Sequence, residues 1–166
     1  RAPLHRISAP FRSGNRRHDA ANSVMTIAGI DGCKGGWLCI EELSDRLRAF
    51  IAGNIRDTVD QLPPGTLIGI DIPIGLPNDD SRHCDIEARR LLGARGVCVF
   101  PAPLRVTLEN TTDATSYEVA KQTQRRHHTR GKGISQQAWR ILPKIRQVDG
   151  LLRADVKRAE QIREVH

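Results

Sequence analysis

The sequence has few aromatic residues and no long apolar run. Only 4% of its 166 residues are Phe, Trp or Tyr, so it offers few rings on which the bases of a single-stranded nucleic acid could stack. No stretch approaches the roughly 18–20 consecutive apolar residues of a membrane-spanning helix, because Gly, Asp and Pro interrupt every apolar run. The sequence therefore excludes a membrane span and argues against a dedicated single-strand binder.

The cysteines lack the spacing of a metal site. The sequence contains four, at positions 33, 39, 84 and 98, with no Cys-x-x-Cys pair and no ordered Cys/His ligand spacing. We interpret them as reduced and mostly buried thiols. This interpretation predicts a cytoplasmic protein.

The size and composition are those of one globular domain. Hydrophobic residues make up 39% of the chain and charged residues 27%, which favours a single α/β domain over residues 25–166. Residues 1–24 contain five Arg and one Asp and show no hydrophobic period. We expect them to form a disordered leader or a misannotated start that adds nothing to the core, with an organellar transit peptide as the alternative.

Much of the positive charge lies in one basic segment, residues 119–148. This basic segment holds eight Lys or Arg residues and no acidic residue. A local surplus of one sign favours an anionic partner more strongly than a high overall charge does. The competing interpretation is a mobile, solvated loop, because Gly131 and Gly133 lie among polar residues.

The first half of the sequence predicts a sheet built mainly from its N-terminal residues. The pattern indicates strands over 26–33, 37–42, 47–52 and 66–74, with a Lys-Gly-Gly turn after the first. A helix over 55–62 follows Asn54, a candidate N-cap.

The second half is predominantly helical. We expect a helix over 84–93 with Ala88, Leu91 and Leu92 facing inward, and a short extended piece over 97–100. Further helices are predicted over 116–124, 135–147 and 151–161, and a last strand over 162–166.

One phrase occurs twice: an apolar strand followed by Gly, Ile and Asp. It ends in Asp31 in the first strand and in Asp71 in the fourth. An isolated carboxylate is costly in an apolar setting, and the carboxyl ends of parallel strands meet at one edge of a sheet. Paired carboxylates there suit Mg²⁺ or Mn²⁺, since hard cations prefer oxygen ligands. The alternative is that each Asp caps a turn or a helix.

Several other polar residues allow two interpretations each. Lys34, in a glycine-rich turn, is a candidate phosphate contact, although the turn is also explained as a plain hairpin. Arg89 and Arg105 suit either a phosphate contact or an ion pair. Asp85 and Glu87 suit either a third carboxylate of the site or a solvated helix face, of which the second is the commoner role. His127 and His128 do not have the spacing of metal ligands, so we interpret them as exposed loop residues.

These motifs together resemble a known protein family. Their order along the chain is IAGIDG at 27–32, LIGIDIPIGL at 67–76, RHCDIEARRLLG at 82–93, VFPAPLR at 99–105, GKGISQQ at 131–137 and PKIRQVD at 143–149. The chain resembles the bacterial and archaeal proteins called domain of unknown function 429, which are regarded as predicted ribonuclease-H-like nucleases. The family pattern continues past His166, so the resemblance also implies a domain truncated at its C-terminal end.

The resemblance implies a ribonuclease-H-like fold and a metal site. The fold has a mixed central sheet flanked by helices, with strands 1–3 antiparallel and strand 4 parallel beside strand 1. Asp31 and Asp71 would then be metal ligands and catalytic residues, with Glu164 as a further catalytic carboxylate and Lys144 as a substrate contact.

Three kinds of function are compatible with these residues. The first is Mg²⁺- or Mn²⁺-dependent hydrolysis of nucleic acid, with the carboxylates of Asp31 and Asp71 within about 4–8 Å of each other. The basic segment would then face the same sheet edge and contact phosphates, which positions a strand without reading its sequence. The second is a nucleotide- or metabolite-binding module on the same scaffold, and a third is an interaction protein without activity. The expected substrate contacts are Lys34, Arg105, Arg125, Arg126, Arg130 and Lys144.

Overall fold

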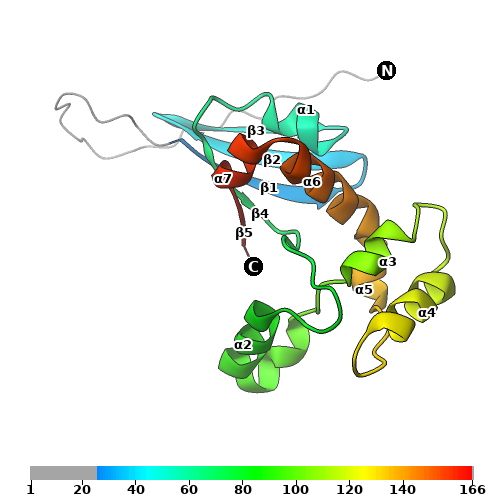
Figure 1. The fold of residues 1–166 in the computed structure, drawn as a ribbon. Coiled ribbons are helices and arrows are strands. Elements are labelled where there is room, and N and C mark those ends of the chain that lie inside the picture. The colour runs from blue at the N-terminus through cyan, green and yellow to red at the C-terminus, as the bar shows by residue number, and fades with distance from the viewer. Residues whose placement is uncertain (1–25, 166) are drawn as a thin grey trace. The chain divides into compact units, whose positions relative to one another are not determined.

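Residues 26–165 are described by a computed structural model, shown in Figure 1. They divide into two compact units: the first contains residues 26–72 and 150–165, and the second is Pro73–Asp149. The expectation for residues 1–24 lies outside the described residues. Each unit is described by itself below.

The first unit contains a mixed five-stranded sheet (Figure 1). Its strands are β1 (Ile27–Cys33), β2 (Gly36–Leu43), β3 (Arg46–Ala52), β4 (Leu67–Ile70) and β5 (Ile162–Glu164). They lie in the order β3-β2-β1-β4-β5, with β1–β2 and β2–β3 antiparallel and β1–β4 and β4–β5 parallel. The predicted arrangement of the first four strands is confirmed.

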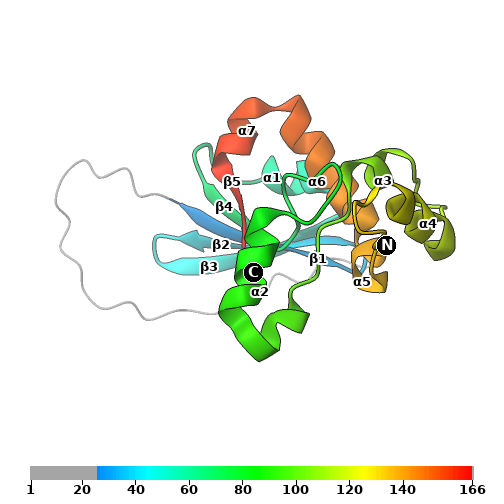
Figure 2. The same cartoon turned by 60° about the horizontal axis from the view of Figure 1, so that its bottom comes forward.

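Within the described residues of the first unit, the sheet has one covered face and one open face. Successive side chains along a strand point to opposite sides, so each strand contributes to both faces. Trp37, Cys39 and Ile30 are buried on the covered face, together with Ile68 and Ile70 of β4. Two helices of the first unit, α1 (Ile55–Val59) and α7 (Val156–Gln161), lie on one side of the sheet in Figure 2.

Helix α1 begins where its sequence predicts. The Asn54 side chain accepts a hydrogen bond from the Asp57 N–H at 2.9 Å, which satisfies one of the free amides of the first turn. Ile55 and Val59, one turn apart, are both buried. The predicted N-cap and the apolar spacing are therefore confirmed, although the helix is shorter than expected.

A carboxylate is buried on the covered face. Glu41 is fully buried, its Oε2 accepts a 2.6 Å hydrogen bond from Arg48 Nε, and its Oε1 has no partner among the described residues. Burial, together with the negative charge of Glu41, raises the pKa of the neighbouring Cys39 thiol to about 11. Cys39 therefore fits the expectation of a buried thiol. Cys33 is intermediate and Cys84 and Cys98 are exposed, so the expectation that the cysteines are mostly buried is wrong.

The second unit is helical. It contains α2 (His83–Leu92), the 3₁₀ helix η1 (Gly93–Cys98), α3 (Arg105–Glu109), α4 (Tyr117–His127) and α5 (Gln136–Arg140). Helix α6 (Leu142–Ala154) runs across the boundary between the units. Pro143 lies in the first turn of α6, where a missing N–H costs no helical hydrogen bond.

Four element predictions need correction. The fourth strand ends at Ile70 rather than residue 74, since Pro73 cannot donate to a sheet ladder. Residues 97–98 belong to η1 and not to an extended piece. The predicted helix over 135–147 is two helices, α5 and α6. The predicted helix over 151–161 is divided between the end of α6, which continues through Gly150 to Ala154, and α7.

Helix α2 is oriented differently from the prediction. Leu91 and Leu92 are 77% and 47% exposed, so they do not face inward. The side chain that the helix buries is Asp85. The apolar pattern alone predicted the wrong face, because the buried side chain is a carboxylate held by polar partners.

No helix within residues 26–165 combines the length and the apolar character that crossing a membrane requires.

Candidate functional site

Asp31 and Asp71 lie next to each other at the carboxyl end of β4. In the parallel pairing of β1 with β4, Ile30 is opposite Ile70, and the Asp71 N–H continues the ladder to the Ile30 carbonyl at 3.4 Å. Neighbouring strands are about 4.8 Å apart. The repeated phrase therefore brings its two aspartates together, as the sequence predicts, while their separation at the carboxylates stays a prediction.

The two aspartates share the open face of the sheet. Ile30 and Ile70 are buried on the covered face, so the next residue on each chain points the other way. Both Asp31 and Asp71 are exposed. Two exposed carboxylates on adjacent strands give a hard cation oxygen ligands together with access for water and a phosphate.

Glu164 lies on the strand beside Asp71 but on the opposite face. It is the register partner of Ile70 in the parallel pairing of β4 with β5, and register partners point to the same side of a sheet. The structure thus brings together two of the three predicted catalytic carboxylates. Among residues 26–165, no group of three His, Cys, Asp or Glu side chains is arranged to hold a metal ion.

Magnesium or manganese still fits the pair. Mg²⁺ is commonly bound through one or two carboxylates, with waters and substrate phosphates completing the shell. Asp31 and Asp71 are the residues that would hold it.

Lys34 projects from the turn between β1 and β2. Cys33 pairs with Gly36 at the end of the hairpin, and Lys34 is exposed. The glycines have a structural explanation: Gly35 has φ of 95°, and a Cβ on Gly36 would lie 1.9 Å from the Ala52 carbonyl oxygen. The plain hairpin therefore accounts for the glycines, and a phosphate contact by Lys34 stays a prediction.

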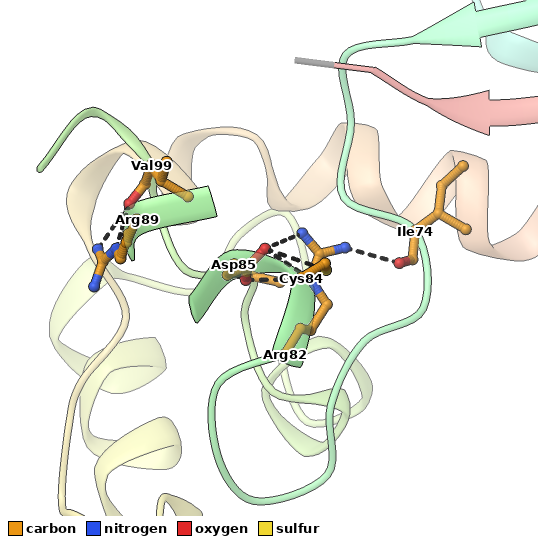
Figure 3. Close-up of polar contacts among 7 residues, drawn as sticks. Ile74, Arg82, Cys84, Asp85, Arg89 and Val99 are labelled. Atoms are coloured by element: carbon orange, nitrogen blue, oxygen red, sulfur yellow. Dashed lines mark hydrogen bonds and ion pairs between the residues drawn. The ribbon is translucent and has the colours of Figure 1, made fainter. Parts of the chain in front are cut away.

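Asp85 is a buried structural residue, which corrects its assignment to a solvated face. Figure 3 shows Arg82 bonded to both Asp85 and the Ile74 carbonyl. The Arg82 Nη2–Asp85 Oδ1 distance is 2.5 Å, and Asp85 Oδ2 accepts from the Ala102 N–H at 3.1 Å. Cys84 Sγ lies 3.7 Å from Asp85 Oδ1. Two motifs of the family resemblance, at 82–93 and 99–105, therefore meet at this carboxylate.

Two further arginines of these motifs, Arg89 and Arg105, also make contacts within the second unit. Arg89 donates twice to the Val99 carbonyl, at 2.7 and 3.0 Å (Figure 3). Arg105 Nη1 forms a 2.7 Å ion pair with Asp149, and the Arg105 N–H donates to the Pro77 carbonyl. Of the two interpretations of Arg105, the structure shows the ion pair, and its phosphate contact stays a prediction, as does that of half-buried Lys144.

The basic segment is partly neutralised by acids outside it. Arg130 contacts Asp80 at 2.8 Å, Lys121 contacts Glu118 at 3.8 Å and Arg146 contacts Asp113 at 3.6 Å. Arg125 and Arg126, in the last turn of α4, are exposed and have no ion-pair partner among the described residues. These two are the strongest positions for a phosphate contact.

Asp80 connects the loop before α2 to the loop after α4. The hydrogen bonds from Arg130 and from the Ser81 N–H lower the pKa of Asp80 well below its usual range. His128 is 8% exposed, with Nε2 3.7 Å from Asp80 Oδ1, while its Nδ1 accepts from the Arg130 N–H. The expected exposure is thus correct for His127, the last residue of α4, and wrong for His128.

These features define an α/β protein with a mixed five-stranded sheet, flanked by helices, that carries two aspartates side by side on its open face. A family model described as "Protein of unknown function (DUF429)" matches residues 29–166. The chain belongs to this family. No curated protein and no solved structure matches the chain.

Proposed function

We propose that this chain is a divalent-metal-dependent hydrolase of phosphodiester bonds in nucleic acid, built on a ribonuclease-H-like fold. One observation carries the proposal: the parallel pairing of β1 with β4 sets Asp31 beside Asp71 on the open face of the sheet. The strand order β3-β2-β1-β4-β5 supports the fold, because it has the adjacent first and fourth strands that the family resemblance implies.

The chemistry requires a nucleophile, charge stabilisation and a way to hold a polyanion. Asp31 and Asp71 are the metal ligands, and bound divalent ions supply the activation of water and the stabilisation of the leaving oxygen. In the reaction, a water oxygen bonds to phosphorus as the phosphorus–oxygen bond of the leaving group breaks. The attacking water gives up a proton, and the oxygen of the leaving group gains one to become a hydroxyl.

Positive side chains supply the affinity for the strand. Exposed Arg125 and Arg126 suit phosphate contacts, and exposed Lys34 lies three residues after Asp31. Phosphate contacts fix the position of a nucleic acid without reading its sequence. That the basic segment faces the two aspartates remains a prediction of this proposal.

Cleavage of end-labelled RNA, DNA and RNA–DNA hybrids in Mn²⁺ tests the proposal. The wild-type protein should cleave at least one of them, and D31N and D71N should each lose at least about 100-fold in rate, since even outer-shell partners of a metal cost 10–100-fold. The matched control is D45N, which changes an exposed Asp in the turn after β2. Equal cleavage by wild type and D31N would identify a contaminating nuclease and contradict the proposal. Binding of nucleotides without any cleavage would favour the alternative, a nucleotide- or metabolite-binding module.

A further inference from the structure

The open face of the sheet presents large apolar side chains around the two aspartates. Ile27, Ile40, Leu47, Ile51 and Val165 are between 44% and 51% exposed. The strand register places the first four on the same side as Asp31. Val165 lies on that side too, because a Cβ built on Gly69 would be 3.2 Å from Val165 Cγ1. The proposed metal site is therefore continuous with an apolar surface.

Gly29 is a strand-interior glycine for which the fold gives no reason. It does not have a positive φ, and a Cβ built on it would meet no atom of residues 26–165 within 4 Å. Its partner Gly69 differs, because a Cβ there would lie 3.2 Å from Val165 Cγ1. Glycine weakens a strand interior, and it often marks a place where a ligand approaches the backbone closely. The open space at Gly29, beside Asp31 on the same face, therefore leaves room for a ligand to contact the backbone.

The neighbours of Gly29 define what fits this space. Along β1 its same-face neighbours are Ile27 and Asp31, and across the sheet they are Ile40 and Gly69, beyond which Val165 projects. The space thus has apolar neighbours on three sides and a carboxylate on the fourth. A flat ring can lie on the backbone there, because no Cβ projects from Gly29.

We propose that the open space over Gly29 receives a nucleobase of the substrate, next to the bond that is cleaved. This inference rests on the proposed function and specifies its substrate as an unpaired nucleotide. Residues two apart on a strand are about 6.6 Å from each other, so one nucleotide with its base over Gly29 reaches Asp31 with its phosphate. A base paired in a duplex is stacked on both faces, so the site favours single-stranded ends, loops or mismatches.

Two small probes test the base contact apart from cleavage. The full-length protein is titrated with adenosine 5′-monophosphate and with ribose 5-phosphate in Mg²⁺, and backbone amide shifts are followed by NMR. The nucleotide should bind at least about fivefold more tightly, in line with the stacking contribution of a single base, and should shift the amides of Gly29 and Ile40. Equal affinities, or shifts confined to other residues, would overturn the proposal.

Substitutions on the open face provide the matched comparison. G29L fills the space and should abolish the preference for the nucleotide, and G29A should reduce it while leaving the melting temperature unchanged or higher. The control is A49L, which adds the same side chain on the same face at the register partner of Ile40 on β3. A49L should keep the preference. If A49L and G29L behave alike, or if G29L instead dissociates a dimer seen by sedimentation, the face serves another role and the inference is wrong.

The two proposals fail in different ways. If the wild-type protein cleaves nucleic acid but binds both probes equally, the hydrolase proposal is supported and the proposed base site is wrong. If the protein never cleaves nucleic acid, but the Gly29 amide shifts only with the nucleotide, the hydrolase proposal is wrong. The space over Gly29 then binds a nucleobase without a neighbouring bond that is cleaved.

Discussion

Removal of the Asp85 carboxylate should destabilise the protein more than any other single acid-to-alanine change on α2. Arg82 is 8% exposed and Asp85 3%. In D85A the Arg82 guanidinium would keep its bond to the Ile74 carbonyl but lose the buried carboxylate of Asp85, and the Ala102 N–H would lose its acceptor. Breaking a buried pair by removing one partner costs about 3–5 kcal/mol. The whole stability of a domain is only about 5–15 kcal/mol.

Helix α2 offers a matched control for this change. Glu87 and Arg90 form an ion pair with the same i,i+3 spacing, but their side chains are 38% and 71% exposed. Solvent screens such a pair, so E87A should cost about 0–1 kcal/mol. D85N should fall between the two, because an amide oxygen can still accept from the Ala102 N–H.

Urea unfolding followed by far-UV circular dichroism measures the free energy of unfolding of the wild type and of these variants. We expect the free energy of unfolding to decrease in the order wild type, E87A, D85N, D85A. If D85A and E87A differ by less than about 1 kcal/mol, the burial of the Arg82–Asp85 pair does not have the consequence argued here.

Three further predictions concern individual side chains. Burial raises the pKa of Cys39 to about 11, so iodoacetamide at pH 8 should alkylate the exposed Cys84 and Cys98 before Cys39, as followed by mass spectrometry. Equal alkylation rates at the three cysteines would contradict the burial of Cys39. R130A should raise the pKa of Asp80 toward its ordinary value of about 3.9, as measured by an NMR titration. Because folding lowers the pKa of Asp80, its contacts stabilise the wild-type protein at pH values above about 3.9, and this stabilisation is lost as the pH falls toward the folded pKa. R125A/R126A should lower the slope of log affinity for duplex DNA against log salt by about one unit for each true phosphate contact, and an unchanged slope would remove these residues from the interface.

Local sequence patterns were sufficient for most of the sheet and for the aspartate pair. Short apolar runs and the hairpin glycines predict β1 to β3, and the Asn54 cap predicts the start of α1. The repeated phrase singled out Asp31 and Asp71, and the family resemblance implied that their strands are parallel neighbours, as the pairing of β1 with β4 shows. The open space over Gly29 was not predicted, although a glycine inside a strand, two residues before the candidate ligand Asp31, was visible in the sequence.

Interactions between distant residues could not be read from the sequence. Asp85 has the spacing of a solvated helix position, and its burial depends on Arg82 and on the amide of Ala102, 17 residues away. Likewise, Arg130 belongs to a segment without acids but pairs with Asp80, 50 residues earlier in the chain. Charge counted along a segment therefore overstated the free charge of the basic segment.

The central claim is that Asp31 and Asp71 together bind a divalent ion, and paramagnetic broadening by Mn²⁺ tests it most directly. In the amide NMR spectrum of the wild-type protein, substoichiometric Mn²⁺ should first broaden the signals of residues 30–32 and 70–72, and D31N should abolish this broadening while D45N leaves it intact. Broadening that is uniform, that centres on other residues such as Asp79 and Asp80, or that survives in D31N would contradict the account.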